Sequence, residues 1–129
     1  MAETIKAIHY VNQFFGGLGG EERANAPPQF VVGAKGPGQL MQRIEPRIEI
    51  VATVICGDNY AADDALRVAG EICDLIQRRI DAGTIERPEA LLAGPAFQAG
   101  RYGMACGAVC AAVEEQLGLP AVTGMSVES

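Results

Sequence analysis

The stretch that decides the fold runs from Leu91 to Gly118 and reads LLAGPAFQAGRYGMACGAVCAAVEEQLG. Its pattern predicts a short apolar strand, a turn at Gly94-Pro95, a loop, and then a helix that begins at Arg101. This order leaves unpaired backbone N–H groups and a partial positive charge at the helix start, close to the strand end. Arg101 adds a forked cation at that point, so the segment suits a carboxylate or a phosphate. Alternatively, the glycines and the proline are only the turn residues of an ordinary strand-to-helix connection.

Elsewhere the chain alternates apolar, β-branched runs with amphipathic runs. Strands are predicted over 5–12, 49–56, 90–94 and 120–124, with a short edge strand at 30–32, and helices over 63–81 and 101–117, with a short helix over 39–43. Residues 57–60 are predicted to form a polar turn, Asp63 or Asp64 to cap the long helix, and Gly83 to end it. Strands that alternate with helices predict a parallel sheet with right-handed crossovers and helices on both faces. The predicted fold class is therefore α/β, a three-layer, mostly parallel sheet that corresponds to half of a Rossmann-like or flavodoxin-like fold.

The length, composition and net charge of the chain limit the class of protein. The 129 residues suffice for one α/β domain over 1–129, and 49% apolar with 20% charged residues is typical of a globular chain. A net charge of -6 argues against a nucleic-acid surface, and the short apolar runs argue against a membrane span. The start of the chain has no signal-peptide pattern, so a cytoplasmic protein with free thiols is expected. No metal site is predicted, because the four cysteines form no CxxC pair and there is one histidine.

In sheets of this kind ligands bind beyond the carboxyl ends of the strands. The loops expected there are 13–22, 56–60, 94–103 and 124–129. The first of them contains GGLGG at 16–20, whose glycines allow positive φ or close approach to a ligand. It does not match the GxGxxG dinucleotide fingerprint, and Pro27-Pro28 prevents a following helix, so a Rossmann nucleotide site is not favoured.

Five of the seven aromatic residues also fall in these loops: Phe14, Phe15, Tyr60, Phe97 and Tyr102. An aromatic box beside an arginine would suit a zwitterion such as an N-methylated amino acid, whereas the alternative is that the rings pack the loops together. The predicted substrate-binding or anion-binding residues are Gly16, Gly17, Gly19, Gly20, Glu21, Asp58, Asn59, Tyr60, Phe97, Gly100, Arg101 and Tyr102.

The identity of a catalytic residue stays open at this point. Cys56 at a strand end and Cys106 near a helix start are the candidates, because a helix N-terminus and an arginine lower a thiol pKa. The alternative is that both are buried and behave as small apolar residues. Asp58, Glu21 and Glu22 are candidate acid–base groups, although loop carboxylates are more often simply solvated.

Several segments together resemble a known family. HYVNQFFGGLGGEE, GPG at 36–38, IVATVICGDNY, LAGPAFQAGRYGMACG and PAVTGM resemble, in the same order, the amino-terminal portion of the glycine/sarcosine/betaine reductase selenoprotein B family. The resemblance runs from about Ile8 to Gly124. It implies a component of an anaerobic, multi-subunit reductase that cleaves a C–N bond of an amino acid or its N-methylated derivative.

The resemblance also implies where the chemistry is located. In that family the substrate is held as a Schiff base on a pyruvoyl group of a partner chain, and a selenocysteine in a UxxCxxC setting cleaves the bond. This chain contains neither motif, and it stops at 125–129 where family members continue. No cofactor is therefore expected in this chain. It is either a fragment or a free-standing subunit, inactive alone and assembled as a hetero-oligomer with the remaining half of the component or a partner subunit.

Three interpretations follow. The first is a substrate-pocket subunit or fragment of such a reductase, acting on a small amino-acid-like substrate. The second is a non-catalytic module of α/β fold that binds an anion or a nucleotide. The third is an assembly subunit whose glycine loops pack against a partner. The substrate, the oligomeric state and the catalytic nucleophile are left open by the sequence.

Overall fold

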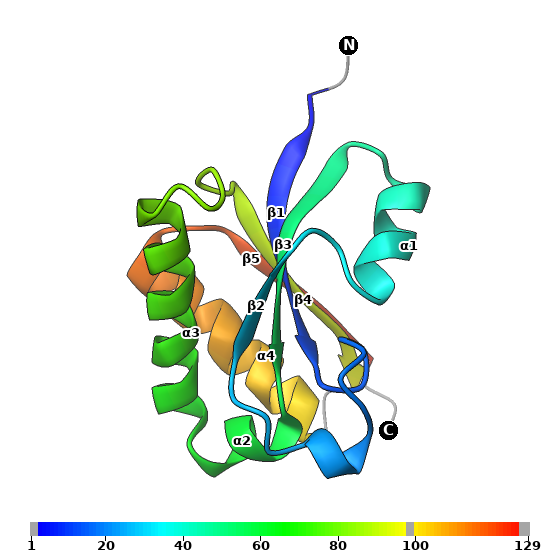
Figure 1. The fold of residues 1–129 in the computed structure, drawn as a ribbon, viewed down its shortest axis with the longest axis vertical. Helices are drawn as coiled ribbons and strands as arrows, with labels where there is room; N and C mark the ends of the chain where they lie inside the picture. Colours follow the sequence, from blue (N-terminus) through cyan, green and yellow to red (C-terminus); the bar gives the residue numbers. More distant parts are fainter. Residues whose placement is uncertain (1–2, 98–99, 127–129) are drawn as a thin grey trace.

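Five strands form one sheet in the order β2-β3-β1-β4-β5 in the computed structural model, which describes residues 3–97 and 100–126 (Figure 1). The strands are β1 (Ile5–Asn12), β2 (Gln29–Val32), β3 (Ile48–Cys56), β4 (Ala90–Phe97) and β5 (Ala121–Ser126). The helices are α1 (Pro37–Ile44), α2 (Asp58–Asp63), α3 (Ala65–Asp81) and α4 (Arg101–Ala112), with a 3₁₀ turn at Glu21–Arg23 and a π-helical turn at Val113–Leu117.

The sheet is parallel except at one edge. β1 pairs in parallel with β3 on one side and with β4 on the other, β4 pairs in parallel with β5, and the short β2 runs antiparallel to β3. β1 therefore separates β3 from β4, and the predicted mostly parallel α/β sheet is confirmed. From Ala7 to Asn12 every residue of β1 is buried, as expected for a central strand with both faces covered.

The helices are divided unequally between the two faces of the sheet. α3 and α4 lie side by side on one face, whereas α1 lies on the other (Figure 1). The larger part of the core lies under α3 and α4, where Val54, Ile72, Ile76 and Val109 are almost completely buried. On the α1 face, α1 approaches β1 and β3: Gly38 lies against His9, and the Gln42 side chain accepts a hydrogen bond from the Ile50 N–H. β4 and β5 have no helix over them on that face among the described residues.

The long helix begins at Ala65, two residues later than predicted. Asp64 is the N-cap, since its carboxylate accepts the Arg67 N–H at 3.2 Å, and Gly83 follows the helix end with a φ of 74°. The predicted turn at 57–60 is wrong. Residues 58–63 instead form α2, because the N–H groups of Asn59 and Tyr60 both bond to the carbonyl of Ala24, which anchors the first turn.

The end of β4 also differs from the prediction, in which the strand broke at Gly94-Pro95. β4 continues through the cis peptide bond at this position to Phe97, because β5 follows it after a register shift and pairs again with Ala96 and Phe97. The final helix is regular only to Ala112, and its last turn is π-helical before Gly118 adopts a left-handed conformation. None of the helices within the described residues is long and apolar enough to cross a lipid bilayer.

Candidate functional site

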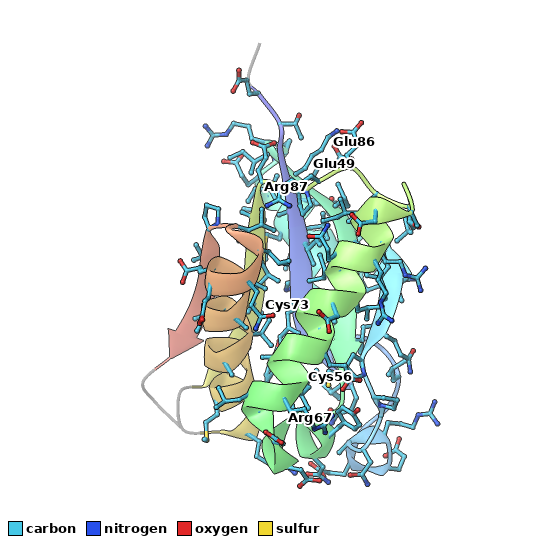
Figure 2. All side chains as sticks on the ribbon, turned by 90° about the vertical axis from the view of Figure 1, so that its left-hand side faces the viewer. Glu49, Cys56, Arg67, Cys73, Glu86 and Arg87 are labelled. Atoms are coloured by element: carbon cyan, nitrogen blue, oxygen red, sulfur yellow. The ribbon has the colours of Figure 1, made fainter. Side chains whose placement is uncertain are left out.

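The carboxyl ends of the parallel strands meet at one end of the molecule. Figure 2 shows Cys56, the last residue of β3, at this end near Arg67, while Glu49 at the start of β3 lies at the opposite end with Glu86 and Arg87. Three segments meet beside Cys56: the loop after β1, α2 with its first residue Asp58, and the start of α4. The loops that were predicted to bind a ligand were expected at this end of the sheet.

Asp58 is held by the end of β1. Its carboxylate accepts a hydrogen bond from the Asn12 side-chain amide at 3.2 Å, and its backbone N–H donates to the Gln13 side-chain oxygen at 2.9 Å. The Asn12 side-chain oxygen accepts the Phe15 N–H at 2.9 Å and so shapes the following loop. Both amide side chains are buried. Asp58 is thus positioned by neighbours that are themselves fixed.

The electrostatic environment of Asp58 links the three segments. Partial burial raises the pKa of the Asp58 carboxyl, while the Asn12 hydrogen bond and the positive charge of Arg101 lower it, and Glu21 raises it again. Burial is the largest of these effects. Arg101 at the start of α4 and Glu21 in the turn that follows residues 16–20 thus act in opposite directions on the pKa of Asp58.

Arg101 forms an ion pair in this structure. Its guanidinium Nη2 lies 2.8 Å from Oε1 of Glu21, and the two side chains are 45% and 73% exposed. Exposed pairs of this kind contribute about 0–1 kcal/mol, so this contact adds little to the stability of the fold. Glu21 makes the direct contact with Arg101, whereas Asp58 is influenced by the charge of Arg101 without a direct contact.

Tyr102 turns inward from the start of α4. Its ring lies 5.8 Å from the Phe15 ring and 6.3 Å from the Tyr10 ring, measured between centroids. Its buried hydroxyl has no hydrogen-bond partner within the described part of the chain, and burial raises its pKa. A buried hydroxyl without a partner is uncommon.

The aromatic residues do not form one box. Phe15 packs with Tyr102, as the packing alternative predicts, whereas Tyr60 donates a hydrogen bond to Glu71 on α3 and stacks under Arg67 at 5.7 Å. Phe14 is mainly exposed and meets Phe15 edge to face. The side chain of Phe97 lies outside the described residues.

The two candidate thiols are enclosed. Cys56 and Cys106 are both fully buried, and burial raises the pKa of each thiol to about 12, above the ordinary 9.0. For Cys56 the charges of Glu71 and Asp58 add to the effect, and for Cys106 that of Cys110 does. The environment therefore shifts the pKa in the opposite direction to the lowering expected from the helix start and Arg101.

The glycine loop is shaped largely by packing. A Cβ atom on Gly16 would stand 2.5 Å from Ile55, so this glycine is required by a close contact with β3. Gly19 has a φ of 144°, and the Gly20 N–H bonds to the Glu22 carboxylate at 2.9 Å. The 3₁₀ turn at Glu21–Arg23 follows in place of a helix, which agrees with the absence of a dinucleotide fingerprint.

The structure thus brings Glu21, Asp58, Arg101 and Tyr102 to one end of the sheet. Gly17, Gly20, Asn59 and Gly100 lie in the same loops and helix starts, and 98–99 and 127–129 lie outside the described residues. Asn12 and Gln13, which hold Asp58, are not among the predicted site residues. Their signal was present: two amides follow the apolar run of β1 directly at its carboxyl end.

Comparison with known proteins gives a consistent result. The sequence model described as glycine/sarcosine/betaine reductase selenoprotein B matches residues 4–129. Among curated proteins, the chain is 51% identical over 128 residues to "Sarcosine reductase complex component B subunit beta" of Peptoclostridium acidaminophilum. It is 44% identical over 126 residues to "Glycine reductase complex component B subunit gamma" of Symbiobacterium thermophilum. It is 41% identical over 128 residues to "Betaine reductase complex component B subunit beta" of P. acidaminophilum.

The lengths differ greatly. These alignments cover 96–98% of this chain but only 27–28% of each relative, so the chain spans a little over a quarter of their length. No solved structure matches the chain.

Proposed function

The chain belongs to the glycine/sarcosine/betaine reductase selenoprotein B family, and we propose from this premise that it forms the substrate-binding part of such a reductase component. The observation that carries the proposal is the gathering of Glu21, Asp58 and Arg101 from three segments at the carboxyl edge of the sheet. The substrate class is a small zwitterion, glycine or an N-methylated derivative, which has a carboxylate at one end and a cationic nitrogen at the other.

The charges at this edge are complementary to such a substrate. The substrate carboxylate replaces the Glu21 carboxylate as the partner of the Arg101 guanidinium. At this position the start of α4 adds free N–H groups and a favourable dipole. The cationic nitrogen lies toward Asp58 and the released Glu21. Asn12 and Gln13 keep Asp58 in place, whereas Glu21 lies on a turn that has no buried residues.

The chain's own residues supply binding and orientation rather than redox chemistry. The two candidate thiols are buried with a pKa of about 12, so neither is a ready thiolate at neutral pH. The resemblance implies a selenocysteine and a pyruvoyl group, and we place both in other chains or in the remaining part of the component. There they would supply reductive C–N cleavage. In this proposal the chain works in a cytoplasmic hetero-oligomer with the remaining portion of the component.

Calorimetric titration of sarcosine and of acetate tests the site. Arg101→Lys keeps the positive charge but removes the bidentate guanidinium. It should weaken the binding of sarcosine and of acetate by on the order of 1–3 kcal/mol. Glu21→Gln frees Arg101 and strengthens acetate binding. Arg47→Lys is the matched control, because Arg47 also forms an exposed pair with a glutamate, Glu45, near the opposite end of the sheet.

Two outcomes would contradict the proposal. If Arg101→Lys lowers the melting temperature but leaves the affinity for both compounds unchanged, Arg101 only ties the loops together. If Arg47→Lys weakens binding as much as Arg101→Lys does, the effect is not located at this edge.

An assembly role is the second candidate, because a specific surface favours it. Leu40, Ile44 and Val122 are exposed side chains on the α1 face of the molecule, with exposed fractions of 57%, 75% and 60%. Such a patch is typical of a contact surface. The two roles involve different parts of the molecule, since these residues lie on a sheet face and the charged cluster lies at the end of the sheet.

A further inference from the structure

An apolar groove lies between α1 and the uncovered part of the sheet. It has a volume of about 410 Å³, and its lining is almost entirely apolar. Leu40 and Ile44 of α1 form one wall, and Leu92 of β4 and Val122 of β5 belong to the strands beside it. Three of these four side chains are more than half exposed, which is unusual for apolar side chains gathered around one depression.

The topology explains why this chain leaves the groove open. The parallel strands follow the order β3-β1-β4-β5, which corresponds to the first four strands of the flavodoxin-like order 2-1-3-4-5. From β1 the chain crosses to β3, toward the β2 edge of the sheet. From β3 it returns past β1 to β4 and then to β5, toward the opposite edge. Right-handed crossovers therefore put α1 on one face and α3 and α4 on the opposite face, as Figure 1 shows. Nothing in the described residues covers β4 and β5 on the face of α1.

The shape of the groove selects the kind of occupant. One wall is a helix and the floor is the face of a parallel sheet, and the third layer of this architecture consists of helices. A helix placed beside α1 would cover Leu92 and Val122 and would bring its apolar side against Leu40 and Ile44. Helices pack at interaxial distances of about 8–10 Å, which is the spacing expected between α1 and a helix placed beside it.

The comparisons supply a source for such a helix. The chain aligns with only 27–28% of each relative, so the relatives carry a long stretch of polypeptide outside the aligned segment. We propose that an amphipathic helix from that remaining polypeptide of the component packs into the groove between α1 and β4–β5. The inference rests on the family membership and on the partner named in the proposed function. It does not depend on the charged site at the end of the sheet.

Photo-cross-linking in a full-length relative tests the occupant. A photoreactive amino acid is placed in the P. acidaminophilum sarcosine reductase component B subunit beta at the positions that align with Leu40 and Val122. The control is the position aligned with Leu66, which is 82% exposed on α3, on the other face. The expected product joins both groove positions to one peptide outside the aligned segment, with cross-linked residues at helical spacing, and the Leu66 position does not label that peptide.

Three results would overturn the proposal. Cross-linking can be repeated on a mixture of isotopically light and heavy protein. If the groove positions then cross-link only to the aligned segment of a second copy, the groove is a site of self-association. Cross-linked residues on alternate positions would indicate a strand. The absence of any product from both groove positions would show that the groove is open in the complete polypeptide.

Matched substitutions in the short and the long polypeptide provide a second measurement. In this chain Leu40→Glu, Val122→Glu and Leu66→Glu all change exposed side chains, so the three melting temperatures should be similar. In the full-length relative, glutamate at the positions aligned with Leu40 and Val122 should lower the melting temperature, because a charge would then be buried without a partner. Equal effects of all three substitutions in the full-length protein would contradict a covered groove. Sarcosine titration of the same proteins reports separately on the charged site.

Discussion

His9 is an ionisable side chain in the middle of the sheet. It is completely buried in β1, and its Nε2–H donates to the carbonyl of Gly94 at 2.6 Å. Its Nδ1 has no partner among the described residues and lies where a Cβ on Gly38 would be 3.0 Å away. Burial lowers the pKa of His9 below 6.5, and the bond to Gly94 opposes this shift only in part. The folded protein therefore holds this imidazole neutral.

The lowered pKa predicts a pH-dependent stability. The unfolded chain binds a proton at His9 more readily than the folded chain, so the contribution is complete above pH 6.5 and is lost as the pH falls through the folded pKa. Urea unfolding should show a lower free energy of unfolding at pH 5.5 than at pH 7.5. His9→Asn should reduce this difference, and His9 is the one histidine in the chain. An unchanged pH dependence in the variant would contradict a neutral, buried His9.

The thiols give a second prediction at the scale of residues. All four cysteines are free and buried, and burial raises their pKa values to about 11 or 12. At pH 8 a pKa of 12 leaves about one thiol in ten thousand ionised, and the thiolate is the reactive form. A disulfide reagent should thus react slowly with the native chain and rapidly with all four thiols in guanidinium. One fast thiol in the native chain would instead support the low-pKa thiolate that the sequence pattern suggested.

At the scale of elements, the junction of β3 and α2 is a tight connection beside the candidate site. Gly57 donates its N–H to the carbonyl of Ala26 at 2.8 Å, and a Cβ at this position would lie 2.3 Å from the carbonyl oxygen of Ala24. The same Ala24 carbonyl anchors the first turn of α2. The position of Asp58 therefore depends on a backbone contact that only glycine permits.

Gly57→Ala should consequently lower the free energy of unfolding by about 1–3 kcal/mol, because the obstructing atoms are backbone and cannot rotate away. The matched control is Gly70→Ala in α3, where the nearest atom is 3.9 Å away and alanine favours the helix by up to about 1 kcal/mol. Chemical denaturation measures both. Equal and small effects would show that the Ala24 segment moves freely, and the junction would then not position Asp58.

At the scale of the whole molecule, the two regions of interest lie apart. The charged cluster occupies the end of the sheet, and the apolar groove occupies its face over β4 and β5. One surface suits a polar small molecule and the other suits a polypeptide. This division places the proposed binding site and the proposed contact surface in different parts of the molecule.

The proposed division of labour predicts that the isolated chain is inactive. Given a dithiol donor, it should release no ammonia from glycine, no methylamine from sarcosine and no trimethylamine from betaine, because its thiols are buried and it contains no selenocysteine. The control is the full P. acidaminophilum sarcosine reductase complex under the same conditions. Amine release by the chain alone would place the chemistry within these 129 residues and contradict the proposal.

Local pattern was sufficient for most elements and for the end of the sheet at which the candidate loops lie. The β-branched run of β3 and the apolar spacing of α3 predicted both correctly, since each forms by burying one recognisable set of side chains. The start of α4 was also found, because Gly100 and Arg101 mark it. The helix at 58–63 was missed: its first turn is anchored by the carbonyl of Ala24, more than thirty residues earlier, which no local window contains.

Consecutive residues were enough to identify the α/β class, the parallel direction of the main strands and the family, because the alternating apolar periods and the GPAFQAGRYGMACG stretch are local patterns. Only the tertiary structure decided the partners of the side chains. Arg101 meets Glu21 across 80 positions, Asn12 meets Asp58 across 46, and burial raises the thiol pKa that the helix start was expected to lower. It alone also decided which face of β4 and β5 stays open, since coverage depends on the hand of every crossover taken together. Contacts and desolvation arise between distant segments, and so they exist only after the chain has folded.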